Sequence, residues 1–100
     1  IRASDILVRW GGEEFLFVLS GAQAAHAAKF TEKLLQHLRE IRIALRDDTI
    51  SVSASAGIRA VSSAELATIN FDKALQQADV MLYSAKKAGR DQFMMYDAAP

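Results

Sequence analysis

The sequence predicts an α+β sandwich, in which helices pack against an antiparallel or mixed sheet. Three observations support this class. Two adjacent glycines separate apolar runs near the N-terminus, two later segments have helical periodicity, and the segment between them alternates apolar and small polar residues. The expected order of elements is strand, strand, helix, strand, helix, strand. With 100 residues, the chain is expected to form a single unit.

Composition and charge narrow the possible partners. Hydrophobic residues make up 51% of the chain, enough for a packed core, and the formal net charge is zero. A chain with this charge balance is not expected to bind nucleic acid or a membrane surface. It has no cysteine, which excludes disulfides and thiolate metal sites, and no apolar run near the roughly 20 residues of a membrane span. We therefore expect a cytoplasmic protein.

The first predicted element is an antiparallel hairpin, with strands over residues 3–10 and 14–20. Gly11 and Gly12 lie between its two apolar runs. The tight turns that join such strands need positive φ angles, which glycine adopts without strain. Apolar residues on both faces of the second strand indicate that it is covered on both sides.

Two carboxylates, Glu13 and Glu14, follow the glycines at once. Successive side chains of a strand point to opposite faces, so one carboxylate can face a ligand at the turn. The glycines would let a bulky anionic ligand approach the backbone, and carboxylate oxygen suits Mg²⁺. The ordinary alternative is a solvated hairpin, because a Gly-Gly turn followed by acidic residues is common.

A helix is predicted over residues 22–44, followed by a turn at 46–48. Asp47 and Asp48 are interpreted as turn residues rather than as a metal-binding pair. The helix prediction rests on an apolar stripe at intervals of three and four residues. The stripe consists of Phe30, Leu34, Leu38, Ile41 and Leu45.

A long strand is predicted over residues 49–62, where apolar residues alternate with serines. Gly57 interrupts the alternation, which indicates a bulge or the close approach of another backbone. A short final strand is predicted over residues 92–96.

A second helix is predicted over residues 71–88. Asn70 is the expected N-cap, and Gly89 stands where a left-handed residue commonly ends a helix. Cations cluster at this end, and the simplest interpretation is that they complement the helix dipole. These cations are Lys86, Lys87 and Arg90.

Two parts of the chain resemble one known family. The hairpin sequence from Arg9 to Phe15, Arg-Trp-Gly-Gly-Glu-Glu-Phe, resembles the signature of the GGDEF domain, the diguanylate cyclase family, in its Glu-Glu form. Residues 78–91 are similar to the family's closing signature, with Asp91 where asparagine is usual. Residues 53–57 resemble its Ser-Ile-Gly strand. The resemblance implies a nucleotidyl-cyclase or palm-like sheet with flanking helices.

The resemblance also implies that residues 1–100 are a partial GGDEF domain. The family's first strand and the helices after it carry a metal-binding aspartate and an asparagine and aspartate that recognise guanine, and this chain has no counterpart of them. We therefore expect these residues to belong to a longer protein, and the 100-residue chain alone to be inactive. The family often carries a sensory domain, so the chain is expected in the cytoplasm, either in a soluble protein or as the cytoplasmic part of a larger, membrane-attached sensor.

The activity implied by the resemblance is condensation of two GTP molecules into cyclic di-GMP, with release of pyrophosphate. A homodimer would carry one GTP on each subunit, with Mg²⁺ or Mn²⁺ as cofactor. Glu13 would bind the metal, and Glu14 would be a second ligand or a base.

By the same resemblance, Gly11 and Gly12 would let the nucleotide lie against the hairpin. Lys86 and Arg90 would hold the triphosphate, and their spacing of four permits a shared ligand if the helix end is intact.

Arg2 and Asp5 match the family's inhibitory site, which binds the product cyclic di-GMP. A third cation from the following helix corresponds to Lys33. Lysine keeps the charge but lacks the planar fork of arginine, so weaker product inhibition is expected.

Two functions of different classes remain open. The chain belongs either to an active cyclase or to a catalytically inactive GGDEF module that binds GTP or cyclic di-GMP as a sensor. The intact glycines and carboxylates favour the enzyme. A palm-like nucleotidyl transferase of another family is a third possibility, against which the closing motif argues.

Overall fold

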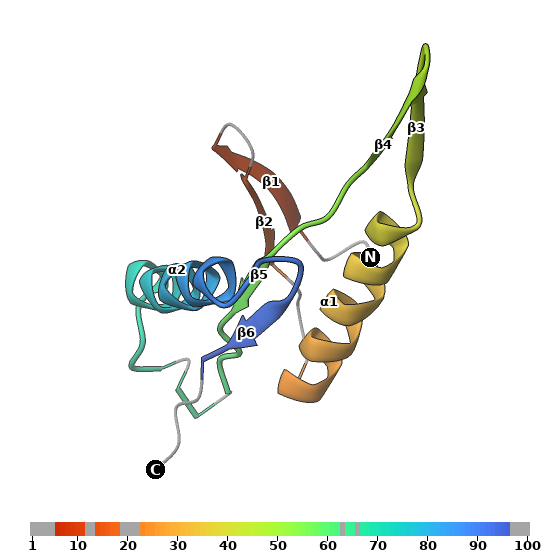
Figure 1. Ribbon diagram of the computed structural model, residues 1–100. Helices are drawn as coiled ribbons and strands as arrows, with labels where there is room; N and C mark the ends of the chain where they lie inside the picture. The colour runs from red at the N-terminus through yellow and green to blue at the C-terminus, as the bar shows by residue number, and fades with distance from the viewer. Residues whose placement is uncertain (1–5, 12–13, 19–22, 63, 66, 97–100) are drawn as a thin grey trace.

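The computed structural model of the protein describes residues 6–11, 14–18, 23–62, 64–65 and 67–96, and it has a mixed α+β fold (Figure 1). Within these residues two helices separate three groups of short strands. In order, the elements are β1 (Ile6–Gly11), β2 (Glu14–Val18), α1 (Ala24–Arg39), β3 (Arg42–Leu45), β4 (Asp48–Ser51), β5 (Ala56–Ile58), α2 (Phe71–Lys87) and β6 (Phe93–Met95).

The strands β1 and β2 form the predicted antiparallel hairpin. Their register runs from Ile6 opposite Val18 to Arg9 opposite Phe15, and then shifts so that Gly11 lies opposite Glu14. A shift of this kind marks a β-bulge, which strengthens the local twist. The predicted positions 3–5 and 19–20 lie outside the described residues.

The predicted first helix is too long. α1 ends at Arg39, and β3 and β4 follow as an antiparallel ribbon with Ile43 opposite Ile50. The turn at Arg46 and Asp47 is as expected. Isoleucine is β-branched and prefers a strand, where it packs against a residue on the neighbouring strand. This pairing, which the helical stripe could not reveal, outweighs the helical spacing.

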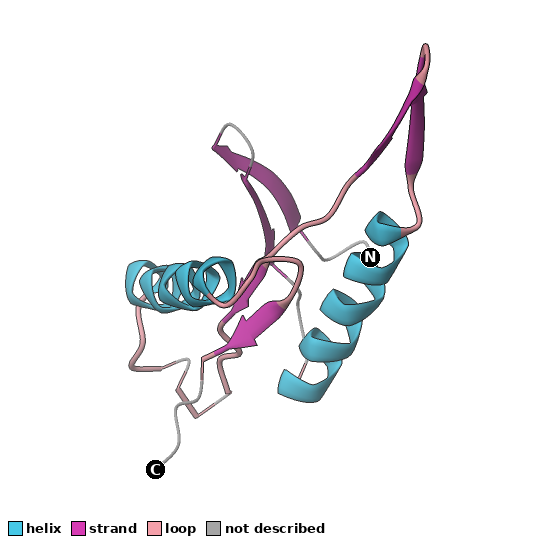
Figure 2. Ribbon diagram, in the orientation of Figure 1, coloured by secondary structure: helices cyan, strands magenta, loops and turns pink. Residues whose placement is uncertain are grey.

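The β3–β4 ribbon projects away from the rest of the molecule (Figure 2). Its large apolar residues are 42–51% exposed, and they are Ile43, Leu45 and Ile50. Ile41, just before β3, is 42% exposed. The predicted long strand over 49–62 is therefore two separate strands, β4 and β5, because β4 leaves the body to pair with β3.

The strands β5 and β6 pair in parallel and lie between the two helices (Figure 1). α2 packs closely on β5, because a Cβ built on Gly57 would stand 2.1 Å from the carbonyl oxygen of Ala78 and 2.3 Å from the nitrogen of Leu82. The predicted close approach of another backbone at Gly57 is thus confirmed.

The described strands form three separate two-stranded sheets rather than the single sheet expected. Among the residues whose burial is described, Leu35 of α1 and Ala85 of α2 are the buried apolar residues. Neither helix in the described ranges is long and apolar enough to cross a membrane.

Candidate functional site

The tip of the β1–β2 hairpin brings a glycine opposite a carboxylate residue. Gly11 is the last residue of β1, and its partner Glu14 is the first residue of β2. Glycine has no side chain, so a ligand can approach the backbone at this position. The other predicted members of this part of the site, Gly12 and Glu13, lie outside the described residues.

The second part of the predicted site is the C-terminal end of α2. The N-cap prediction for this helix is confirmed, because the Asn70 side chain accepts a hydrogen bond of 2.7 Å from the Lys73 backbone N–H. The helix ends at Lys87, one residue before the predicted end. Lys86 lies in its last turn and is half-buried.

A Schellman arrangement closes α2. The N–H of Gly89 donates to the Lys86 carbonyl at 3.4 Å, and the N–H of Arg90 donates to the Ala85 carbonyl at 3.0 Å. Gly89 has a φ of 124°, so the prediction of a left-handed residue at this position is confirmed.

Arg90 does not continue the helix. It lies beyond the cap with a φ of 64°, and its side chain is exposed. The helix end is closed by Gly89 as predicted, but the spacing of four between Lys86 and Arg90 does not act as a helical i,i+4 pair. The reason is the left-handed turn at Gly89, which ends the helical path three residues after Lys86.

Arg39 of α1, which was not predicted as a site residue, forms hydrogen bonds to the turn that follows α2. The Nε of Arg39, in the last turn of α1, donates to Asp91 Oδ1 at 2.9 Å, and its Nη2 donates to the Asp91 carbonyl at 3.0 Å. The Asp91 N–H donates to Ser55 Oγ at 3.0 Å. The hydrogen bond to Asp91 raises the pKa of Arg39. The pair is 52 residues apart in sequence, and no local pattern indicates it.

Only one of the three predicted inhibitory-site residues lies within the described ranges. Lys33 is exposed on α1, whereas Arg2 and Asp5 lie outside these ranges. Lys33 is thus accessible to a ligand, which the inhibitory assignment requires.

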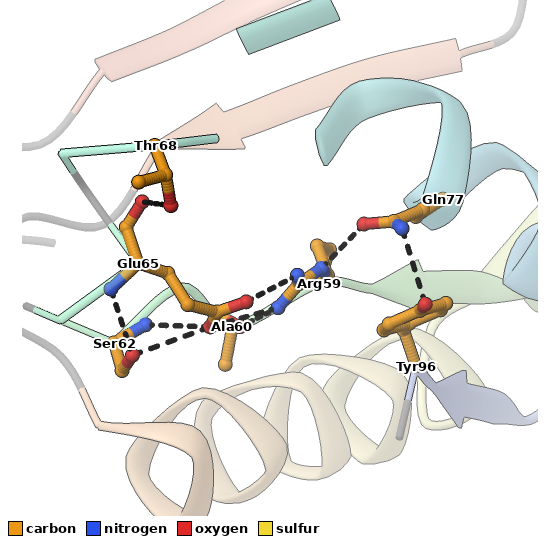
Figure 3. A network of polar contacts seen from close by, with 7 residues as sticks. All are labelled: Arg59, Ala60, Ser62, Glu65, Thr68, Gln77 and Tyr96. Carbon is orange, nitrogen blue, oxygen red and sulfur yellow. Dashed lines mark hydrogen bonds and ion pairs between the residues drawn. The ribbon is translucent and has the colours of Figure 1, made fainter. Parts of the chain in front are cut away.

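A polar network surrounds Arg59, just after β5 (Figure 3). Its guanidinium, whose side chain is 5% exposed, is 2.7 Å from Glu65 and 4.7 Å from the centroid of the Tyr96 ring. It also donates to Gln77 Oε1 at 2.7 Å, and Gln77 Nε2 contacts the Tyr96 hydroxyl at 3.1 Å. The hydrogen bond from Arg59 lowers the pKa of Glu65 to about 2.

A hollow of about 320 Å³ adjoins this network. It is lined by Arg59, Thr68, Ile69, Asn70, Lys73 and Gln77. Because the charge of Arg59 is already paired with Glu65, we interpret the network as a structural connection between the loop after β5, α2 and β6. Within the described ranges no three His, Cys, Asp or Glu side chains form a cluster suited to a metal ion.

Comparison with known proteins identifies the class to which this fold and hairpin belong. Residues 1–92 match the family described as "Diguanylate cyclase, GGDEF domain", and the chain belongs to this family. It is 32% identical over 91 residues to the diguanylate cyclase DgcP of Pseudomonas aeruginosa, and 27% identical over 100 residues to the diguanylate cyclase DosC of Escherichia coli.

A solved structure shares the fold. The diguanylate cyclase SiaD of Pseudomonas aeruginosa, in complex with its activator SiaC, superposes with a TM-score of 0.83 over 96% of this chain at 28% identity. The chain matches 91% and 99% of its own length to DgcP and DosC, but it spans only 13% and 21% of those proteins and 35% of the SiaD chain.

Proposed function

We propose that residues 1–100 form part of a diguanylate cyclase domain that condenses two GTP molecules into cyclic di-GMP and two pyrophosphates. The observation that carries this proposal is the glycine hairpin, in which Gly11 pairs with the carboxylate residue Glu14 inside a family match over residues 1–92. We propose that the rest of the family domain comes from a longer protein that contains these residues.

The reaction needs two nucleotides held face to face. The 3′-hydroxyl of one GTP attacks the α-phosphate of the other, pyrophosphate leaves, and the second GTP repeats the step in the opposite direction. A homodimer with one GTP on each subunit supplies this symmetry. Holding the reactants in this geometry converts a bimolecular reaction into an effectively unimolecular one, which provides much of the rate enhancement.

Each residue of the proposed site has a distinct task. Gly11 and Gly12 leave space for the nucleotide against the hairpin, and the cations Lys86 and Arg90 neutralise the triphosphate. Glu13 and Glu14 would hold Mg²⁺ or Mn²⁺, because hard carboxylate oxygens are the ligands that these ions prefer. When bound, the ion offsets the negative charge of the reacting phosphates. Glu14 is either a second ligand or the base that accepts the hydroxyl proton.

Two carboxylates are fewer than the near-octahedral ligation of Mg²⁺ requires. We propose that water and the remainder of the domain complete the coordination. We also propose a cytoplasmic location for this segment, as membership of the GGDEF family implies.

Product control is the regulatory part of the proposal. Arg2, Asp5 and Lys33 would bind cyclic di-GMP, with the cations on its phosphates and the carboxylate on guanine N–H groups. Because Lys33 provides a point charge where the family often has a fork, product affinity is expected to be lower than with arginine. Lys33→Arg should therefore strengthen product inhibition. The measurement is the concentration of cyclic di-GMP that halves the rate of the reaction, which should be lower in this variant.

The proposed function is tested by mass spectrometry of the nucleotides formed from GTP and Mg²⁺ by the full-length protein. We expect cyclic di-GMP from the wild type. Glu13→Ala should lower the rate on the order of 100-fold, which is the usual effect of removing one group that stabilises charge in an active site. The matched control is Glu40→Ala, an exposed glutamate at the C-cap of α1, which should leave the rate unchanged.

The alternative function predicts a different pair of results. If the full-length protein forms no cyclic di-GMP but binds it, and Arg2→Ala abolishes this binding, the protein is a sensor and the cyclase proposal is wrong.

A further inference from the structure

We propose that Arg39 is a positioning residue for the triphosphate, because its pair with Asp91 fixes the turn that carries Arg90. This inference rests on the proposed function, in which Arg90 contacts the triphosphate. Arg39 itself would not touch the nucleotide.

The turn after α2 needs external support. Gly89, Arg90 and Asp91 have φ angles of 124°, 64° and 53°. Glycine takes such angles freely, whereas residues with a Cβ adopt the left-handed region at a cost, which is smaller for Asp91 than for Arg90 because short polar residues tolerate it better. Two consecutive left-handed L-residues are expected only where neighbouring groups stabilise them.

Asp91 receives that support at three points. Its carboxylate accepts from Arg39 Nε at 2.9 Å, its carbonyl accepts from Arg39 Nη2 at 3.0 Å, and its N–H donates to Ser55 Oγ at 3.0 Å. A planar guanidinium that donates to two acceptors fixes orientation as well as distance. The side chain and both backbone polar groups of Asp91 are therefore held by α1 and by the segment before β5.

Arg90 lies between two fixed points. On one side, the Schellman bonds tie Gly89 and Arg90 to the last turn of α2, and on the other side Arg39 and Ser55 hold Asp91. The helix alone does not fix Arg90, since the regular helix ends at Lys87 and holds Arg90 only through the hydrogen bond from its backbone N–H to the Ala85 carbonyl. The direction in which the exposed Arg90 side chain leaves the turn, and hence its place relative to Lys86, depends on the hold at Asp91.

The chain offers a matched control on the same side chain. Arg39 Nη1 also lies 3.5 Å from Glu32 Oε1, an ion pair within α1 whose glutamate is 51% exposed. Surface pairs of this kind contribute little. Glu32→Gln removes a charge next to Arg39 without touching the turn.

The test measures nucleotide binding to the full-length protein in Mg²⁺. The probes are a GTP analogue with a methylene group between the α- and β-phosphorus atoms, which cannot react, and GMP, which lacks the outer phosphates. We expect Arg39→Gln to weaken binding of the analogue roughly tenfold, which is the order typical when a residue that orients a ligand group is lost. The affinity for GMP should stay unchanged. Arg39→Lys should recover part of the loss, and Glu32→Gln should match the wild type.

A double variant shows whether Arg39 acts through Arg90. Arg39→Gln combined with Arg90→Ala should bind the analogue no more weakly than Arg90→Ala alone, because the group being positioned is then absent. If Arg39→Gln does not fold, Asp91→Asn serves instead, with a smaller expected loss of about threefold because an oxygen acceptor remains.

The possible failures are distinguishable. If Arg90→Ala weakens binding of the analogue and Arg39→Gln does not, the positioning role of Arg39 is wrong while the proposed function stands. If Arg39→Gln weakens binding of the analogue and of GMP equally, the positioning role is also wrong, because the effect is then a general loss of structure. If Arg90→Ala binds the analogue like the wild type, the assignment of Arg90 to the triphosphate fails, and this inference fails with it.

Discussion

Gly57 is the residue at which the packing of α2 on β5 leaves no space for a side chain. The atoms nearest to a Cβ at this position are a carbonyl oxygen, a nitrogen and a Cα of α2, all within 2.9 Å. These are backbone atoms of a regular helix, so they cannot move aside as the end of a flexible side chain could. The sequence indicated this contact, because a glycine that interrupts an alternating strand commonly marks a close approach.

At this position, Gly57→Ala should lower the free energy of unfolding by about 1–3 kcal/mol, the usual range for overpacking a filled interior. Urea unfolding followed by tryptophan and tyrosine fluorescence measures the change. Ala60→Gly, a change of the same size in the opposite direction outside the strand, is the control and should shift the midpoint less. A Gly57→Ala midpoint equal to that of the wild type would show that α2 is free to move away from β5.

At the site, residue identity and residue position were predictable to different degrees. The sequence placed Gly11 and Glu14 at the hairpin and Lys86 near the end of α2, because glycine turns and helix ends are set by local chemistry. It did not indicate that Arg90 itself would be left-handed, since such a conformation of an arginine has no sequence signal of its own. Arg39 was missed for another reason: its partner is distant in sequence.

At the scale of elements, the caps were predicted and the β3–β4 ribbon was not. Asn70 and Gly89 act on their own helix, so the sequence around them is sufficient. Ile41, Ile43 and Leu45 recur with period two, but Ile41 and Leu45 also extend the helical stripe of α1. Only pairing with β4 decides between a helix and a strand here, and the propensity of β3 alone does not reveal that pairing.

The Arg59 network connects the loop after β5 to α2 and β6, and its main bond is pH-sensitive. The folded protein holds the pKa of Glu65 at about 2, below the ordinary value of 4.5. A carboxylate with a depressed pKa stabilises the fold above its unfolded pKa, and this contribution is lost as the pH falls toward the folded value. The relevant window is therefore between about pH 5 and pH 2.

Glu65→Gln should destabilise the protein at pH 7, and its difference from the wild type should shrink as the pH falls through this window. Urea midpoints measured at several pH values test the expectation. In an Arg59→Met background the pH-dependent difference should become smaller, because the main partner that lowers the pKa of Glu65 is gone while the hydrogen bonds from Ser62 remain. A difference between wild type and Glu65→Gln that stays constant from pH 7 to pH 2 would contradict the pairing.

At the scale of the whole molecule, the chain is less compact than a folded domain of its length. Its accessible surface is 7501 Å², compared with about 5,600 Å² for a compact folded protein of 11.0 kDa. Its radius of gyration is 15.0 Å, compared with about 13 Å for a compact domain of this length. A composition with 51% hydrophobic residues provides material for a core, but composition does not say whether the chain alone can enclose it.

The 100-residue chain by itself should therefore be marginally stable and inactive. In the part of the chain that the structure describes, the strands form three sheets of two strands each with unpaired edges, and the large apolar residues of the β3–β4 ribbon are exposed. We expect a broad thermal transition by circular dichroism, binding of the dye ANS to exposed apolar surface, and no cyclic di-GMP by mass spectrometry after incubation with GTP and Mg²⁺. The full-length protein, assayed in parallel, should show a sharper transition and form the product. Cyclic di-GMP from the isolated chain would mean that these residues alone complete the metal and guanine sites, contrary to the proposal that the remainder of the domain supplies them.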